Sequence, residues 1–395
     1  MKRELLHTPE GVRDIYNGEC ERKLSLEADI LSVLRTYGYH PIQTPSFEFF
    51  DIFGKEIGST PSKELFKFFD REGNTLVLRP DITPSIARCA SKYFMEEDIP
   101  LRFCYTGNTF TNNSSYQGRL KECTQSGAEL IGDSSVDADA EMIALSVQVL
   151  KAAGLSDFQI SVGHVDFLGG LFLAAGLSED LEEEIREFIK NKNFYAVEDL
   201  VGDLSLDPDL IELFGMLKSF MVSASCIKKA KEKAKNYEKI YGALERLEQL
   251  DQLLQLYQVE SYVSYELSML SSLDYYTGII FRAYTFGTGQ PIVKGGRYDE
   301  LLTYFGKEAA ATGFVVVVDQ LMAALARQGI DIPVQEKTIW LVYNTQNRAN
   351  ALTIAGKLRK SGEQVELMKL TENTSKELFE DYAQKYQIKD VIYCL

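Results

Sequence analysis

The sequence predicts an α+β fold in which helices flank a sheet, with a helical insertion and a small C-terminal α/β domain. Helix and hairpin signals alternate over residues 18–131, and the apolar spacing becomes helical over about 177–258. Strand and helix signals alternate again over 338–394. A chain of 395 residues is long enough to bury one large core and a second, small one.

The first element is an amphipathic helix, predicted over residues 18–37. Its apolar stripe at helical spacing consists of Leu24, Ala28 and Leu31, widened by Ile30 and Leu34. Residues 37–39 end the helix. Residues 40–45 are expected to be extended, because a residue that precedes proline avoids the helical region.

A β-hairpin follows, with strands over 65–70 and 75–79 and a Gly-Asn turn between them. Residues 81–95 have the pattern of a helix. Two further strands are predicted over 101–111 and 119–131, joined by a polar loop. These elements predict a region in which hairpins and helices are packed together.

From about 177 to 258 the apolar residues recur at helical spacing and predict a helical insertion. The two clearest stripes are Leu181, Ile185, Phe188 and Ile189, and Leu247, Leu250, Leu254 and Tyr257. The charge-rich stretch from Lys228 to Lys239 has two interpretations. A solvated helical face is favoured, and a basic face that contacts RNA over Lys228 to Lys235 is the alternative.

Strand signals return beyond the insertion, at 261–270, 277–285 and 312–318, and a helix is predicted at 319–328. A connector that contains proline then separates a core of residues 1–328 from a small α/β domain of residues 334–395. The predicted elements of that domain are strands at 338–343, 363–369 and 389–394 and helices at 347–361 and 374–386. Such alternation predicts a parallel or mixed sheet.

Composition and charge describe an ordinary globular chain, with 45% hydrophobic and 25% charged residues. The net charge of −16 argues against a large basic surface for nucleic acid. Six dispersed cysteines without a C-x-x-C pair, and no apolar run of the ~18 residues that span a bilayer, predict a cytoplasmic protein without membrane association. Three scattered histidines predict no metal site, and no cofactor is expected.

Seven motifs, in family order, resemble the histidyl-tRNA synthetase family over roughly residues 8–325. They are residues 9–14, 38–48, 78–83, the hairpin around 104–132 with Gly118-Arg119, 272–278 (SLDYYTG), 295–299 (GGRYD) and 313–320. The resemblance implies a class II aminoacyl-tRNA-synthetase-like antiparallel sheet flanked by helices. It also implies a homodimer, because the second of these motifs forms the dimer interface in that family.

The resemblance implies a pocket for free L-histidine, lined by Asp81, Thr83, Gln125, Glu129, Tyr275 and Tyr276. The first three would receive the α-amino group, and Glu129 and Tyr276 would hold the two imidazole nitrogens. Arg119 is a possible contact for the carboxylate. A lone Tyr pair is more often part of a core, and only the joint occurrence of the motifs favours a ligand pocket.

Three arginines that the family uses for ATP are replaced, by Thr111, Ser271 and Gln320. Their loss removes about 4–9 kcal/mol of charge-assisted bonding to phosphate. Val317 also stands where the family has a glycine that lets the nucleotide approach. We therefore expect a protein that binds the amino acid and carries out no catalysis.

This combination resembles the regulatory subunits of ATP phosphoribosyltransferase, the enzyme of the first step of histidine biosynthesis. The resemblance implies a non-catalytic subunit that a short-form catalytic subunit requires for activity, in a hetero-octamer built on synthetase-like dimers. It also implies feedback by L-histidine. The domain at 334–395 is shorter than an anticodon-binding domain, so no tRNA is expected as a partner.

Two alternatives stay open. One is a histidine-binding, synthetase-like module that serves a different partner, which co-expression with a short transferase would test. The other is an active histidyl-tRNA synthetase, which ATP binding or adenylate formation would reveal.

Overall fold

The structure is a computed structural model that describes residues 6–54, 60–113, 120–219, 222–271, 273–334, 338–386 and 388–395. The chain divides into two compact units. The larger comprises Met1–Ile15 and Leu26–Ile332, and the smaller comprises Tyr16–Ser25 and Pro333–Leu395.

The larger unit is built on a sheet with eight described strands in the order β1-β5-β6-β11-β10-β9-β7-β8. In that order the strands are His40–Pro41, Leu101–Phe110, Glu122–Ile131, Ala311–Val317, Val293–Arg297, Ile279–Thr285, Phe158–His164 and Val263–Tyr265. The described inner strands, from β5 to β7, pair antiparallel, whereas β1 and β8 pair parallel to their neighbours at the edges. The predicted fold class is confirmed, and the sheet as a whole is mixed.

One face of this sheet packs against helix α3 (Val136–Ala152) in the main core. Successive side chains of a strand point to opposite faces, so every second residue of β5, β6 and β11 reaches that core. Examples that are fully buried there are Cys104, Ala128, Leu130 and Val316. The alternate residues of the same strands face the other side.

Helix α1 (Asn17–Thr36) agrees with the predicted helix in extent, but its predicted stripe is partly wrong. The buried residues are Leu26, Ile30 and Leu34, whereas Leu24 is 59% exposed and Ala28 is exposed too. Leu26, Ile30 and Leu34 repeat at intervals of four residues and lie above one another on one face of the helix. Leu24 and Ala28 belong to a neighbouring face.

The predicted hairpin is confirmed as part of a small sheet whose described strands are ordered β2-β4-β3. These strands are Phe47–Phe49, Thr75–Leu78 and Lys67–Phe69, and all their pairings are antiparallel. Gly73 forms the turn with φ of 87°, in the left-handed region that glycine tolerates best. Helix α2 (Thr83–Tyr93) follows directly, so the loop between β4 and α2 is held at both ends.

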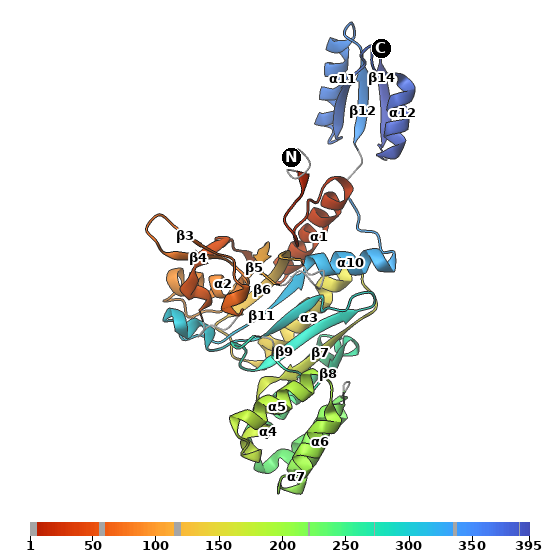
Figure 1. Ribbon diagram of the computed structural model, residues 1–395. Coiled ribbons are helices and arrows are strands. Elements are labelled where there is room, and N and C mark those ends of the chain that lie inside the picture. The colour runs from red at the N-terminus through yellow and green to blue at the C-terminus, as the bar shows by residue number, and fades with distance from the viewer. Residues whose placement is uncertain are drawn as a thin grey trace. The chain divides into compact units, whose positions relative to one another are not determined.

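The insertion is helical, as predicted. Its described α-helices are α5 (Glu179–Lys190), α6 (Phe194–Gly202), α7 (Pro208–Gly215), α8 (Ala224–Lys233) and α9 (Glu238–Leu256). Helices α4 (Val165–Ala175) to α7 gather at the β7–β8 end of the sheet (Figure 1). Lys231, Lys233 and Lys239 form ion pairs with nearby carboxylates at 2.9, 2.5 and 3.0 Å. These pairs favour the solvated face over an RNA-contacting one.

The smaller unit confirms the β-α-β-α-β pattern. Its elements are β12 (Ile339–Tyr343), α11 (Arg348–Lys360), β13 (Val365–Lys369), α12 (Lys376–Lys385) and β14 (Asp390–Cys394). The three described strands are ordered β13-β12-β14, and both pairings are parallel. A parallel pair needs a crossover, and the two helices supply it.

Candidate functional site

A cavity of about 760 Å³ opens on the face of the large sheet that is turned away from α3. Its floor is formed by alternate residues of four neighbouring strands, β5, β6, β11 and β10. The register places Gln125 of β6 between Gly107 and Val317, and Glu129 of β6 opposite Gly313. Antiparallel pairing therefore brings residues far apart in the sequence onto one polar surface.

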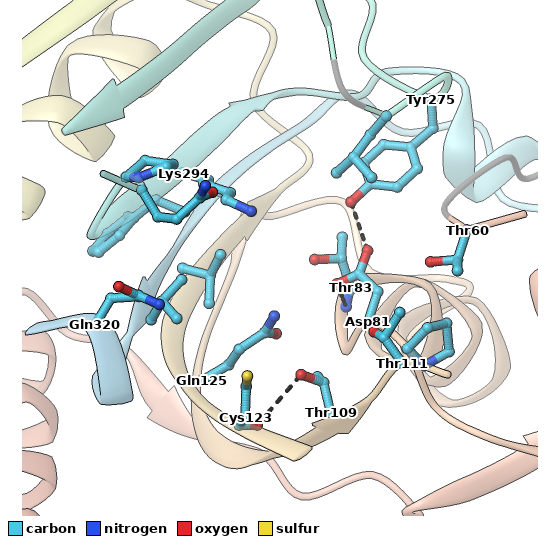
Figure 2. A pocket seen from close by; sticks show the side chains of 18 of the residues that line it. Thr60, Asp81, Thr83, Thr109, Thr111, Cys123, Gln125, Tyr275, Lys294 and Gln320 are labelled. Atoms are coloured by element: carbon cyan, nitrogen blue, oxygen red, sulfur yellow. Dashed lines mark hydrogen bonds between the residues drawn. The ribbon is translucent and has the colours of Figure 1, made fainter. Parts of the chain in front are cut away.

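All six residues predicted to bind histidine line this cavity, namely Asp81, Thr83, Gln125, Glu129, Tyr275 and Tyr276. They come from the loop before α2, from the first residue of α2, from β6 and from the loop that precedes β9. Figure 2 shows Asp81, Thr83 and Tyr275 on one side of the cavity, with Gln125 on its floor. Arg119, the predicted carboxylate contact, and Gly118 beside it lie outside the described residues.

Glu129 is the most elaborately bound group of the site. Within the described part of the chain, three hydroxyl groups donate to its carboxylate. Thr83 Oγ1 and Tyr105 Oη donate to Oε1 at 2.8 and 3.2 Å, and Tyr298 Oη donates to Oε2 at 2.5 Å. A carboxylate offers about four acceptor positions, so one position is left for a ligand.

The Glu129 side chain is 1% exposed, and this burial raises the pKa of its carboxyl to about 8. The hydrogen bonds from Tyr298 and Thr83 act in the opposite direction, because they stabilise the ionised form. Burial is the larger effect. The site therefore holds a carboxyl group that changes its charge near neutral pH and responds strongly to any donor or cation that enters.

Asp81 forms a second acidic centre, at the start of α2. Its Oδ2 accepts a hydrogen bond from Tyr275 Oη at 2.8 Å, and its Oδ1 accepts one from the Thr83 backbone N–H at 3.3 Å. Burial raises the pKa of the Asp81 carboxyl, while the bond from Tyr275 lowers it. Tyr275 in turn packs edge to face against Tyr276, with ring centroids 5.1 Å apart.

Two glycines make room for these groups. A Cβ atom at Gly313 would overlap Oε2 of Glu129, and one at Gly296 would lie 2.7 Å from the ring of Tyr276. Any larger residue at either position would displace a side chain of the site. The motif G-G-R-Y-D thus contributes space at Gly296 and a hydroxyl donor at Tyr298.

Gln125 has an unused hydrogen-bonding capacity. Its Oε1 is buried and has no hydrogen-bond partner in the described part of the chain. A buried carbonyl oxygen without a partner costs about 1–3 kcal/mol, which a ligand N–H would recover. The orphaned oxygen lies on the floor of the cavity, where a donor of a bound molecule would meet it (Figure 2).

The charge of the cavity is unbalanced. Among its described lining residues, Glu64, Asp81 and Glu129 are acidic and Lys294 is the one base. Once Glu129 is ionised, a triphosphate would meet more negative than positive charge here, whereas an ammonium group would be attracted. The site is therefore suited to a small cationic or zwitterionic ligand.

Two of the three positions predicted to have lost an arginine lie at the cavity. Thr111 and Gln320 line it, as does Val317. Ser271 is not among the described lining residues; it is exposed, and its Oγ donates to the carbonyl oxygen of Leu273. What these positions would do for a nucleotide stays a prediction.

Three residues of the site, Tyr105, Tyr298 and Lys294, were not predicted from the sequence. Tyr298 could have been predicted, because it belongs to the recognised G-G-R-Y-D motif. Tyr105 lies on β5 at an even spacing from Gly107 and Thr109, so strand periodicity would have placed it on the same face. Lys294 could be assigned to the cavity only once strand β10 was known, and that strand was not predicted.

The arginine of the same motif has a structural role. Arg297 is buried and donates to Asp139 of α3 at 2.8 Å, and to the backbone oxygens of Asp133 and Ser135 at 3.0 Å each. It points to the α3 face, while its neighbours Gly296 and Tyr298 face the cavity. Residues 296–298 thus anchor the sheet to α3 and also contribute to the cavity.

Among the described residues, no helix combines the length and apolar character needed to cross a membrane. The described His, Cys, Asp and Glu side chains also form no group of three or more that could hold a metal ion.

Comparisons with known proteins show which family the chain is similar to. Residues 11–321 match the family model described as histidyl-tRNA synthetase. An ATP phosphoribosyltransferase regulatory subunit of Acetivibrio thermocellus is 41% identical over 362 residues, which cover 92% of this chain and 86% of the relative. One of Ruminiclostridium cellulolyticum is 38% identical and covers 100% of this chain and 93% of the relative.

Solved structures show the same likeness. A protein of Bacillus halodurans, described as an ATP phosphoribosyltransferase regulatory subunit/histidyl-tRNA synthetase, superposes with a TM-score of 0.86 at 33% identity. The match covers 99% of this chain and 98% of that one. A histidyl-tRNA synthetase of Nostoc sp. PCC 7120 has a TM-score of 0.79 at 20% identity, over 97% of this chain and 90% of that one, which shows a shared fold alone.

Proposed function

The chain belongs to the family of ATP phosphoribosyltransferase regulatory subunits, and we propose that it exerts its regulatory role in histidine biosynthesis by binding free L-histidine. The cavity on the large sheet is the proposed binding site. The observation that carries this proposal is Glu129, a buried carboxyl with three hydroxyl donors and one acceptor position to spare.

An imidazole matches that spare position, because one of its ring nitrogens carries an N–H. Tyr276 would contact the other ring nitrogen. The ammonium group would be received by Asp81 and by the orphaned Oε1 of Gln125. Charge-assisted hydrogen bonds of this kind contribute about 1.5–3 kcal/mol each. An analogue without the ring N–H would leave Glu129 buried and incompletely paired, which is a basis for selectivity.

We propose that the site no longer activates an amino acid with ATP. Adenylate chemistry needs cations at the phosphates, and the described lining residues offer Thr111 and Gln320 at two of the expected positions. Val317 adds bulk to the same region of the floor. The chain would therefore act through binding and not through catalysis.

The proposed partner is the catalytic subunit of ATP phosphoribosyltransferase, in its short form that lacks a regulatory domain of its own. We propose a synthetase-like homodimer within a hetero-octamer of the two subunits, in the cytoplasm, without tRNA. Histidine would inhibit the enzyme by favouring one arrangement of the assembly. That shift can be no larger than the difference in histidine affinity between the two arrangements.

Isothermal titration of the purified chain with L-histidine and with ATP tests the proposal. We expect histidine to bind and ATP not to bind. ATP binding together with adenylate formation would replace the proposal by an active synthetase. Co-purification with a short transferase on a sizing column tests the partner. Histidine binding without a complex or rescue of transferase activity would indicate a histidine-binding module for a different partner.

A further inference from the structure

The proposed site has receptors for two of the three polar parts of free histidine. Asp81 and Gln125 suit the ammonium group, and Glu129 suits the imidazole. The carboxylate still needs a donor. Ser271, where the related synthetases carry an arginine, is not among the described residues that line the cavity. Another side chain at the cavity must therefore hold the carboxylate.

Lys294 lies at the cavity and carries a donor that a carboxylate needs. It lies on β10, opposite Val315 of β11, and both side chains belong to the cavity face of the sheet. Its neighbours Val293 and Gly295 are buried on the other side of the strand. Strand alternation therefore fixes the lysine toward the cavity, although its long side chain remains partly in solvent.

The positions of the charges match a zwitterion. Figure 2 shows Lys294 and Gln320 on one side of the cavity and Asp81 on the opposite side, with Gln125 between them. Lys294 is close enough to lower the pKa of Asp81 electrostatically. A single small molecule with an ammonium at one end and a carboxylate at the other would therefore match the placement of these two charges.

We propose that Lys294 binds the carboxylate of the amino acid and makes the site selective for an intact α-amino acid over imidazole compounds that lack this group. The inference rests on the proposed histidine site and adds its third contact. An ammonium group is a flexible point charge, unlike the planar guanidinium of an arginine, and it needs no fixed bidentate geometry. A lysine can therefore hold the carboxylate without rebuilding a phosphate-binding arrangement.

The consequence is a measurable selectivity. Histamine and histidinol retain the ring and the ammonium and lack the carboxylate. In the wild type, the lysine repels the net positive charge of these two compounds and attracts the carboxylate of histidine. Because Lys294 is exposed, its effect is smaller than that of a buried pair, and we expect about 10-fold discrimination from this contact.

Titration calorimetry of wild type, Lys294→Met and Lys294→Arg with L-histidine, histamine and histidinol tests the proposal. Lys294→Met should lose about 10-fold in histidine affinity, while its affinity for histamine and histidinol stays unchanged or rises. Lys294→Arg should retain most of the histidine affinity. Lys229→Met, on the exposed surface of α8, is the matched control and should bind all three compounds as the wild type does.

The outcomes separate this inference from the proposed function. If wild type binds histidine and Lys294→Met binds it equally well, or weakens all three ligands equally, Lys294 does not hold the carboxylate and the site itself stands. If wild type binds no histidine, both the site and the role of Lys294 are wrong. A circular dichroism melt of each variant shows whether the fold is intact, which an exposed position should leave unchanged.

Discussion

The two faces of the large sheet are made by the same strands and serve opposite purposes. Toward α3, β6 presents Ala128 and Leu130 to an apolar core. Toward the cavity, the alternate residues Gln125 and Glu129 present polar groups that are buried without full compensation. The core face stabilises the chain by removing apolar surface from water, while the cavity face costs free energy until a ligand arrives.

Stability and ligand binding should therefore be separately changeable in neighbouring residues of one strand. Leu130 and Glu129 are adjacent in sequence, yet their side chains are separated by the backbone of the sheet. A substitution at Leu130 should therefore act on folding, and one at Glu129 on binding. Substitutions on the two faces can test this separation.

Leu130→Ala should have the largest effect on stability. Leu130 is fully buried, and truncating such a side chain leaves a cavity that lowers the free energy of unfolding by about 2–5 kcal/mol. Urea denaturation followed by circular dichroism measures this change. Leu24→Ala is the control, because Leu24 is exposed and should lose less than about 0.5 kcal/mol. A loss of histidine affinity in folded Leu130→Ala would contradict the separation of the faces.

Glu129→Gln should have the largest effect on binding. Glutamine keeps the shape of the side chain and removes the carboxylate charge that we propose receives the imidazole N–H, so histidine affinity should fall about 10–100-fold. Titration calorimetry measures it. Glu122→Gln is the matched control on the same strand, where Glu122 accepts a hydrogen bond from Asn108 and does not line the cavity. Unchanged histidine binding by Glu129→Gln would remove the site assignment.

The buried carboxyl should also make stability depend on pH. The pKa of Glu129 is about 8 in the folded chain and has its ordinary value of 4.5 when unfolded. Between these values the folded state retains a proton that the unfolded state releases, so its stability falls as pH rises, by at most about 1.4 kcal/mol per pH unit. Above pH 8 the contribution levels off. Urea unfolding of wild type and Glu129→Gln at pH 5, 6.5 and 8 measures the difference.

Glu129→Gln should show a weaker decline with pH than wild type, because its side chain does not titrate. Parallel pH profiles of the two proteins would mean that Glu129 is ionised in the empty cavity throughout this range. The energetic contrast between the two faces would then be much smaller than the burial of Glu129 indicates.

Tyr298→Phe should have the smallest effect. It removes the hydroxyl that donates to Oε2 of Glu129 and leaves the ring in place. We expect histidine affinity to fall about 3–10-fold, as for the loss of one hydrogen bond in a network that retains the others. The pKa of Glu129 should rise further, because a donor to its ionised form is lost. An affinity equal to that of the wild type would show that Tyr298 does not set the acceptor position of Glu129.

The sequence predicted the elements whose patterns are local. The hairpin at Gly73 and the β-α-β-α-β order of the smaller unit follow from turn residues and alternation. Helix α3 had no such signal, because most of its residues are buried and no polar face reveals the helical period. Strands β7 and β10 were missed too, and with them the order of the large sheet.

The candidate site was predicted to the extent that motifs carried it. Asp81 and Glu129 were assigned from two separate short motifs. Thr83 of the first motif and Glu129 of the second are 46 residues apart in the sequence, and the structure brings both motifs to one cavity. The contact between Glu129 and Tyr298 spans 169 residues and depends on the pairing of β6 with β11 and of β11 with β10. Sequence periodicity gives the face of each residue but not which strands are neighbours.

The anchoring of Arg297 bears on how fast the proposed ligand can bind and leave. Its guanidinium bonds to Asp139 and to two backbone oxygens, so the adjoining Tyr298 backbone is held by contacts that lie outside the cavity. A receptor that is ordered in advance loses little entropy on capture and needs no slow rearrangement to admit or release its molecule. If the cavity binds histidine as proposed, its occupancy should follow the histidine concentration closely in time, and any delay would arise in the proposed assembly with the catalytic subunit.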